Sequence, residues 1–522
     1  MRATTLFAVT LLSFPSLAQQ PNKLLVIEGD AGFGVAIAVA GDVDADGVDD
    51  LLVSNGGRIF VHSGAIGQLL HTFFIEGYAL VGLGDLDGDG HDDFAIGSQN
   101  AIDGGGLDTG GVFVYSGADF SLLYQVFGQT HDQQFGFSIA SAGDVDGDGK
   151  QDLLVGAPGT NQGPPVAWAG GAFLHSGSDG TLIRAYNGTL DQQRMGYSVA
   201  NAGDLDGDGI PDQVFGAPYA SNWAGRASTY SGSGGNLLAE IDGATFGDIF
   251  LGYSVAGIGD GRILVGAPGL ATQGTAYLAE GGTGAILMSL FGGAGSQEFG
   301  HSVSRVGDFD HDGIQDLLIG APRTEVGGSS GVGRATIHSG LNGSELARFD
   351  GEFFNSWLGF AVAAAGDHDG DGLVDILVCA LNQQAVFLVG FNPYLHASQT
   401  ELSASLGASV NLELSFPFAA ALDPYKVLIS ASGPGPTLHG VEIPLTRDAT
   451  VIDSYFGNYP IPVHLGLHGS LDSAGHATAS FDVPAGLPAS LIGRQFWMAA
   501  IVEPSGMLPT HSSVGVVLTV VL

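Results

Sequence analysis

Short apolar runs separated by turn residues recur along most of the chain. In one unit, an apolar run closed by Gly156-Ala157-Pro158 is followed by Ala172 to Gly177, which ends in Ser-Gly, and then by Leu182 to Tyr186. Apolar runs of about four to eight residues bounded by Gly, Pro and Asp are typical of strands. Four such strands per unit, named A to D in chain order, predict an all-β protein.

An acidic loop between strands A and B makes the repeat visible. Most copies follow an aromatic or apolar residue and Gly, as in Phe135-Gly136. The starts of the units lie 43 to 60 residues apart, a period typical of propellers and solenoids. Because no capping repeats are visible, the seven units predict a seven-bladed β-propeller rather than a solenoid. The acidic loops begin at Asp42, Asp85, Asp144, Asp204, Asp308 and Asp367, and a seventh place, Gly259-Asp260-Gly261-Arg262, keeps the flanks without the loop.

The two ends of the repeat region predict how the ring closes. The last unit ends after its third strand, 385–391, whereas an unpaired apolar run, Leu24 to Glu28, precedes the first unit. We expect this first strand to complete the last blade. The propeller is therefore placed at residues 24–391, followed by a linker at 392–400 and, at 401–522, strand-like runs that predict a small Ig-like β-sandwich.

The N-terminus predicts export. Residues 1–18 resemble a signal peptide, with Arg2, a short apolar stretch and small residues before the expected cleavage point. That stretch is shorter than the roughly 20 residues that span a bilayer, and no later stretch predicts a transmembrane segment. The single cysteine, Cys379, stands in an apolar run and is predicted to be a buried hydrophobic residue. We expect a secreted, extracellular or cell-surface protein without an intrachain disulfide.

Acidic residues outnumber basic ones by 54 to 15, for a formal net charge of −39. Nucleic acid is therefore disfavoured as a partner, since a phosphate backbone requires clustered Lys and Arg. The six loops hold 24 of the 54 acidic residues, four Asp in each. Because hard cations take carboxylate oxygens, this concentration of charge predicts bound metal.

Each loop carries carboxylates at positions 1, 3, 5 and 9 and Gly at position 6, which permits a sharp turn. Alternate side chains of a curled loop point to one side, and the carbonyl of position 7 can face inward. These oxygens suit Ca²⁺, whereas zinc would require His or Cys. The predicted ligands of about six Ca²⁺ ions are Asp42, Asp44, Asp46, Val48, Asp50; Asp85, Asp87, Asp89, His91, Asp93; Asp144, Asp146, Asp148, Lys150, Asp152; Asp204, Asp206, Asp208, Ile210, Asp212; Asp308, Asp310, Asp312, Ile314, Asp316; and Asp367, Asp369, Asp371, Leu373, Asp375.

An EF-hand would match the first six positions of the loop, but it requires a bidentate Glu at position 12 between two helices. Position 12 is apolar in every copy and lies within the predicted B strand. The residues at this position are Val53, Ile96, Val155, Phe215, Ile319 and Val378.

Phe-Gly, then the Asp loop, then Gly-Ala-Pro resembles the FG-GAP repeat of integrin α-subunit propellers and of many bacterial secreted proteins. The resemblance covers residues 24–391. It implies calcium at positions 1, 3, 5, 7 and 9 of each loop and none near Asp260. It also implies a binding or adhesive function.

Alternating strand directions place the A–B and C–D connections on one face and the B–C and D–A connections on the other. The long, irregular loops of this second face carry Trp168, Trp223 and Trp357, with Arg226 and Arg323 nearby. Exposed aromatic residues and Arg are frequent in interfaces, so this face is a candidate site for an extracellular protein or glycan ligand. The alternative is that the tryptophans pack between blades.

Catalytic motifs are missing from the sequence. His62, His175 and His338 each precede Ser-Gly at the end of a C strand, a repeat position that indicates a structural role. We therefore expect a calcium-dependent binding or adhesion protein rather than an enzyme. A hydrolase or lyase on the propeller scaffold and a passive envelope or matrix component are the alternatives.

An enzyme would require convergent acid and base groups outside the calcium loops. The second face offers few carboxylates, chiefly Asp103, Asp108 and Glu325.

Overall fold

The computed structural model describes residues 21–391 except 164–165, 246–248, 270–272, 294, 296, 310–312 and 369–372, and beyond 391 it describes the backbone of nine strands. The predicted signal peptide lies outside this part of the chain. Among the described residues, no helix combines the length and the apolar character needed to cross a bilayer.

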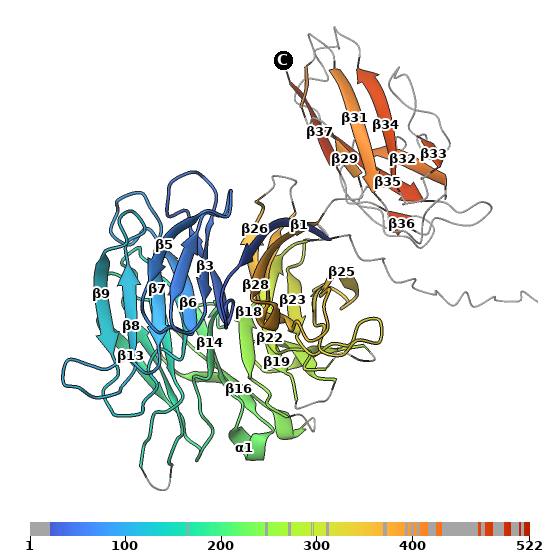
Figure 1. Ribbon diagram of the computed structural model, residues 1–522. Coiled ribbons are helices and arrows are strands. Elements are labelled where there is room, and N and C mark those ends of the chain that lie inside the picture. Colours follow the sequence, from blue (N-terminus) through green and yellow to red (C-terminus); the bar gives the residue numbers. More distant parts are fainter. Residues whose placement is uncertain are drawn as a thin grey trace, which may run out of the picture.

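Seven four-stranded antiparallel sheets surround a central axis (Figure 1), which confirms the predicted propeller. The innermost strand of each sheet contacts the innermost strand of the next, from β2 (Ala36–Gly41) around to β26 (Leu358–Gly366) and back to β2. The chain therefore passes once around the ring, one blade at a time.

Blades 1 to 6 contain four consecutive strands each. Blade 1 has β2, β3 (Asp50–Ser54), β4 (Ile59–His62) and β5 (Leu69–Phe73); blade 2 has β6 (Ala79–Gly84), β7 (Asp93–Ser98), β8 (Gly111–Tyr115) and β9 (Leu122–Phe127); blade 3 has β10 (Ser138–Gly143), β11 (Asp152–Ala157), β12 (Gly171–His175) and β13 (Leu182–Asn187). Blade 4 has β14 (Ser198–Gly203), β15 (Asp212–Ala217), β16 (Arg226–Tyr230) and β17 (Leu237–Asp242); blade 5 has β18 (Ser254–Gly257), β19 (Arg262–Ala267), β20 (Thr275–Glu280) and β21 (Ile286–Phe291); blade 6 has β22 (Ser302–Gly307), β23 (Asp316–Ala321), β24 (Arg334–His338) and β25 (Glu345–Asp350). Short helical turns are α1 (Ala220–Trp223), η1 (Gly243–Thr245) and η2 (Leu381–Gln383).

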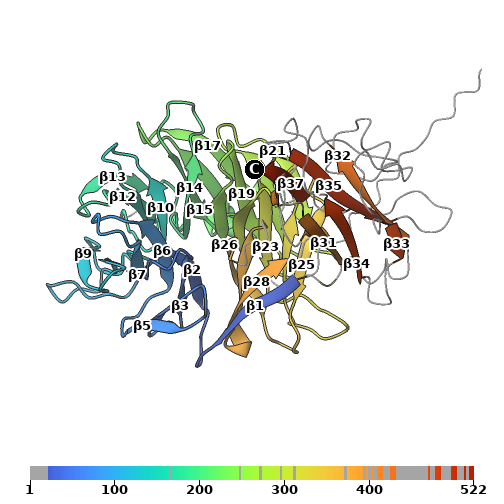
Figure 2. The same cartoon turned by 90° about the horizontal axis from the view of Figure 1, so that it is seen from above.

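Blade 7 joins the two ends of the propeller. Its sheet has the order β1-β28-β27-β26, so the outer strand β1 (Pro21–Glu28) comes from the start of the chain. β1 pairs antiparallel with β28 (Ala385–Phe391), which pairs with β27 (Asp375–Ala380). Figures 1 and 2 show β1 beside β28. The predicted closure of the ring by the N-terminal strand is confirmed.

The hydrophobic core lies between neighbouring blades. The strands next to the innermost ones are almost entirely buried, and β11, for example, is buried along its whole length and is apolar after Asp152. Leu153 and Val155 of blade 3, for example, pack with Val112 and Val114 of blade 2. Cys379 is fully buried in such a cluster, as expected, and burial raises the pKa of its thiol.

Nine strands follow the propeller: β29 (Leu395–Ala397), β30 (Glu401–Ser403), β31 (Ala408–Ser415), β32 (Pro424–Ser430), β33 (His468–Ser470), β34 (His476–Val483), β35 (Gln495–Val502), β36 (His511–Ser512) and β37 (Val516–Val521). They form a three-stranded sheet, β29-β31-β34, and a six-stranded sheet, β30-β37-β35-β32-β33 with β36 on β35. β29 falls inside the segment predicted as a linker. The Ig-like class of the tail and the domain boundaries stay predictions.

Candidate functional site

Carboxylates converge in the acidic loops of blades 1 to 4. In each of these loops the side chains of positions 1, 3 and 9 bring one oxygen each to within 4.8 Å of the others. Such a group of oxygens could hold a metal ion. The four clusters are Asp42, Asp44 and Asp50; Asp85, Asp87 and Asp93; Asp144, Asp146 and Asp152; and Asp204, Asp206 and Asp212.

Backbone N–H groups fix the shape of these loops, as the third copy shows. Asp144, at position 1, accepts hydrogen bonds from the N–H of Gly147 at 2.7 Å and of Gly149 at 2.9 Å. Asp148, at position 5, accepts one from the N–H of Lys150 at 2.9 Å and is not a member of the cluster. Gly149, at position 6, has a φ of +88°, a left-handed conformation that explains the glycine.

Position 9 is a buried anchor that joins two turns of the same blade. One oxygen of Asp152 accepts hydrogen bonds from the N–H groups of Val145 and Asp146, and the other accepts one from the N–H of Gly177. Gly177 belongs to the Ser-Gly after strand C. A Cβ there would lie 1.8 Å from the carbonyl oxygen of Gln151, which explains the glycine after the C strand in blades 1 to 4 and 6.

The position-9 carboxyls are fully buried in all six loops. Burial raises the pKa of Asp50 to about 6, although its N–H donors act in the opposite direction. Burial also raises the pKa of Asp93, Asp152 and Asp212. A cation beside these groups would stabilise their charged form, because it restores the favourable interaction that water no longer supplies.

The loops of blades 6 and 7 are described in part. Asp316 accepts a hydrogen bond from the N–H of Phe309, and Asp375 accepts one from the N–H of His368, as position 9 does in the other blades. Asp308 accepts one from the N–H of Gly313. The predicted ligands Asp310, Asp312, Asp369 and Asp371 lie outside the described residues.

An arginine occupies the corresponding corner of blade 5, where the acidic loop is missing. The guanidinium of Arg262 forms an ion pair with Asp260. It also donates hydrogen bonds to the carbonyl oxygens of Gly340, at 2.6 Å, and Gln315, at 3.1 Å, both in blade 6. The positively charged side chain of Arg262 therefore links this corner of blade 5 to blade 6.

The second face carries the three tryptophans of the propeller. Trp223 is 57% exposed and Trp168 is 36% exposed. Trp168, Trp223 and Trp357 all have positive φ, a strained conformation for a bulky residue. Trp223 also packs against Tyr219 and Phe250. One part of its side chain is therefore packed, as in the structural alternative, and another part is exposed, as a ligand-binding role requires.

Arginines on this face differ in their partners. The guanidinium of Arg194 lies 5.6 Å from the ring centre of Trp168 and 5.7 Å from that of Tyr219. Arg323 lies 5.0 Å from the ring centre of Trp357 and pairs with Glu298. Arg226, in contrast, pairs with Glu240 and Asp242 in its own sheet, so its charge is already neutralised.

Comparison with known proteins supports the repeat. The FG-GAP repeat family matches residues 135–170, 195–232 and 299–338, which fall in blades 3, 4 and 6. The chain thus carries FG-GAP repeats on a seven-bladed β-propeller and is a distant relative of the integrin α subunits. The three matched blades combine the Gly-Ala-Pro sequence with an acidic loop, whereas every other blade of this FG-GAP propeller lacks one of the two.

Curated relatives of the FG-GAP propeller are distant. The chain is 29% identical to "Integrin alpha-V" of Gallus gallus over 42% of its own length and 23% of that protein. It is 27% identical to "Integrin alpha-5" of Xenopus laevis over 54% and 22% of the two chains, and 33% identical to "Integrin alpha-IIb" of Homo sapiens over 51% and 22%. The chain thus spans less than a quarter of the length of these relatives.

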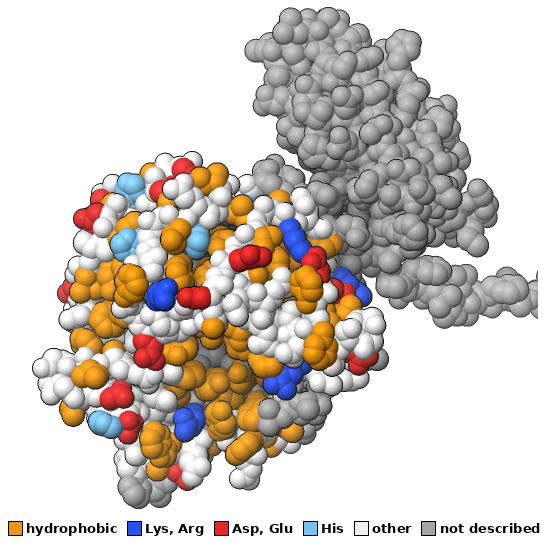
Figure 3. All heavy atoms as spheres, in the orientation of Figure 1, with side chains coloured by type: hydrophobic (Ala, Val, Ile, Leu, Met, Phe, Trp, Pro, Cys, Tyr) orange, Lys and Arg blue, Asp and Glu red, His pale blue; other side chains and the backbone are white. Residues whose placement is uncertain are grey.

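A ring of side chains near the axis was missed by the sequence reasoning, although its signal was visible. The residue after each Phe-Gly or its equivalent directly precedes the A strand, or lies near its start in blade 7. Five consecutive ones, Phe137, Tyr197, Tyr253, His301 and Phe360, have neighbouring ring centres 4.7 to 5.1 Å apart. Val35 and Tyr78 hold the equivalent positions in blades 1 and 2. Figure 3 shows hydrophobic side chains around the hollow at the centre of the FG-GAP propeller.

The three C-strand histidines have the structural role that was predicted. The Nδ1 atoms of His62, His175 and His338 lie 2.9 to 3.1 Å from the carbonyl oxygens of Gly67, Gly180 and Gly343. Each therefore supports its own C–D turn. Burial lowers the pKa of all three imidazoles.

Proposed function

We propose that this chain is a secreted, calcium-binding propeller that binds an extracellular protein or glycan through the face opposite the calcium loops, and that it is not an enzyme. The observation that carries the proposal is the convergence of three carboxylates in each of four loops. The integrin α subunits among its relatives favour a binding function over a catalytic one.

Calcium is the metal that these donors suit best. In the described clusters every donor is a carboxylate oxygen of Asp, and oxygen donors are the ligands that hard cations prefer. In the proposed sites positions 1, 3, 5 and 9 supply side-chain oxygens and position 7 supplies its carbonyl. Calcium would offset the repulsion among the clustered carboxylates and thereby stabilise the fold.

Exposed aromatic side chains support the second face as the ligand face. Trp168, Trp223 and Trp357 are held there in strained backbone conformations, and such strain tends to cluster at functional sites. Arg194 lies beside the ring of Trp168, and Arg323, which is paired with Glu298, lies beside the ring of Trp357. Aromatic residues and Arg together are typical of binding hot spots.

A hydrolase or lyase receives less support from the described residues. Asp103, the first of the carboxylates considered for acid–base chemistry, accepts hydrogen bonds from the N–H groups of Gly105 and Leu107 in its own turn. It is thus a turn-forming residue in this structure.

An array of extracellular proteins and glycans, probed with the full chain in calcium and in chelator, tests the proposal. We expect calcium-dependent binding that Trp223→Ala weakens about tenfold or more. Leu237→Ala, which truncates a 49% exposed side chain on the outer strand β17, is the matched control and should leave binding unchanged. The absence of any calcium-dependent binding would contradict the proposal.

A further inference from the structure

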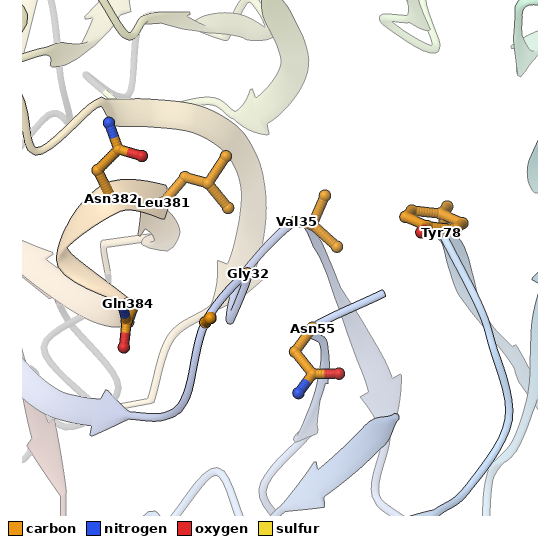
Figure 4. A pocket seen from close by; sticks show the side chains of 8 residues that line it. Gly32, Val35, Asn55, Tyr78, Leu381, Asn382 and Gln384 are labelled. Carbon is orange, nitrogen blue, oxygen red and sulfur yellow. The ribbon is translucent and has the colours of Figure 1, made fainter. Parts of the chain in front are cut away.

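A hollow of about 430 Å³ opens on the second face where the first and last blades meet. Its walls come from the loop after β1, the turn after β3, the residue before β6 and η2. Figure 4 shows Leu381 and Asn382 on one side, Tyr78 on the other, and Val35 and Asn55 between them. The lining residues are Ala31, Gly32, Val35, Asn55, Tyr78, Leu381, Asn382 and Gln384.

The hollow coincides with a break in the aromatic ring around the axis. Blades 2 to 7 carry an aromatic residue or His at the position after Phe-Gly or its equivalent, whereas blade 1 carries Val35. A valine is too small to reach the rings on either side, Phe360 and Tyr78. The space that a seventh ring would fill is therefore left open beside Tyr78.

Among the described residues, none of those that line the hollow is charged. Asp30, next in sequence to the lining residue Ala31, forms an ion pair with Arg58 at 3.5 Å. Asn55 uses its amide within this corner, since it donates to Asp30 and accepts from the N–H groups of Gly57 and Arg58. It therefore forms a fixed wall.

Three other polar groups face the hollow. Asn382 donates its amide to the carbonyl of Asn355, and its side-chain oxygen makes no hydrogen bond within the described part of the chain. In the same part of the chain the Gln384 amide and the Tyr78 hydroxyl have no hydrogen-bond partner. Tyr78 is 40% exposed, so a face of its ring is available for contact.

The walls are fixed before any ligand arrives. Gln384 has a φ of +59°, and its carbonyl accepts a hydrogen bond from the N–H of Gly29 at 3.0 Å. Gly32 has a φ of +84°, and a Cβ there would lie 2.8 Å from the carbonyl oxygen of Asn55. A site that is formed in advance loses less conformational freedom on binding.

We propose that this hollow binds a neutral carbohydrate. An aromatic face beside apolar side chains suits the C–H face of a sugar ring, and uncharged amides suit its hydroxyl or acetamido groups. The absence of charge in the lining disfavours charged sugars and charged peptide side chains. This inference rests on the proposed binding function and assigns it a ligand class and a place.

Saturation-transfer NMR on the full chain in calcium, with neutral methyl glycosides of hexoses and N-acetylhexosamines as probes, tests the site. We expect at least one glycoside to bind, and Tyr78→Ala to weaken it tenfold or more. Val35→Tyr should have the same effect because it restores the seventh ring. Asn382→Ala is a second lining variant, used if Val35→Tyr lowers the melting temperature. Phe74→Ala, an 84% exposed aromatic outside the lining, is the control and should change nothing.

The other possible outcomes distinguish a failure of the carbohydrate site from a failure of the proposed binding function. Glycoside binding that persists unchanged in the lining variants would overturn the site and leave the binding function standing. Protein binding on the array without glycoside binding would also overturn the carbohydrate proposal, with a peptide segment as the ligand class. No binding in either experiment would overturn both proposals.

Discussion

The carboxylate of Asp152 accepts a hydrogen bond from the backbone N–H of Gly177, 3.0 Å away. The acidic loop of the blade is thereby tied to the turn after its third strand. Equivalent pairs join Asp50 to Gly64, Asp93 to Gly117, Asp212 to Gly232 and Asp316 to Gly340. Position 9 thus contributes to the fold even without metal.

Asp152→Ala should destabilise the propeller in calcium and in chelator alike. The substitution leaves the N–H groups of Val145, Asp146 and Gly177 without this acceptor, and a loss of about 3 kcal/mol is expected. Asp148→Ala, at an exposed position of the same loop, should destabilise the protein only in calcium. Unfolding by denaturant under both conditions measures the difference. Equal stability of Asp152→Ala and the unmodified protein in chelator would show that position 9 acts through the metal alone.

Arg262→Ala should destabilise the propeller independently of calcium. The side chain is 14% exposed and holds Asp260 together with two carbonyl groups of blade 6, so about 2 kcal/mol should be lost. Arg262→Lys keeps the positive charge but loses the planar set of N–H donors. Its stability should therefore lie between that of Arg262→Ala and that of the unmodified protein. Melting curves with and without calcium provide the measurement. A loss that disappears in chelator would mean that Arg262 acts through a neighbouring calcium site.

His301 should make the propeller sensitive to acid. Burial, together with the positive charge of Arg323, lowers the pKa of its imidazole to about 4, although a hydrogen bond with the backbone of Phe360 acts in the opposite direction. The unfolded chain keeps the ordinary value of about 6.5. The unfolded chain therefore binds the proton first, and stability falls as the pH is lowered from 6.5 to 4, by at most about 3 kcal/mol from this group.

His301→Phe should remove that part of the acid sensitivity, since Phe holds the same position in blades 3 and 7. The test compares the free energy of unfolding of both proteins from pH 7 to pH 4, so that protonation of the acidic loops cancels. Parallel curves would rule out a contribution from His301.

Much of this fold could be predicted from the sequence because the same pattern of strands and loops recurs in every unit. Leu24 to Glu28 could be assigned to blade 7 because the last unit lacked one strand. The tie between Asp152 and Gly177 was missed because the two residues are distant in sequence, although their shared phase in the repeat was visible. The contacts of Arg262 and the hollow beside Val35 depend on packing between blades, which a single repeat does not encode.

Calcium content is the most direct test of the central claim that the acidic loops bind metal. Elemental analysis of the purified full chain, dialysed after loading, should find about six calcium ions per chain, and Asp144→Asn should lower that number by one. Protein that retains no calcium would contradict the account.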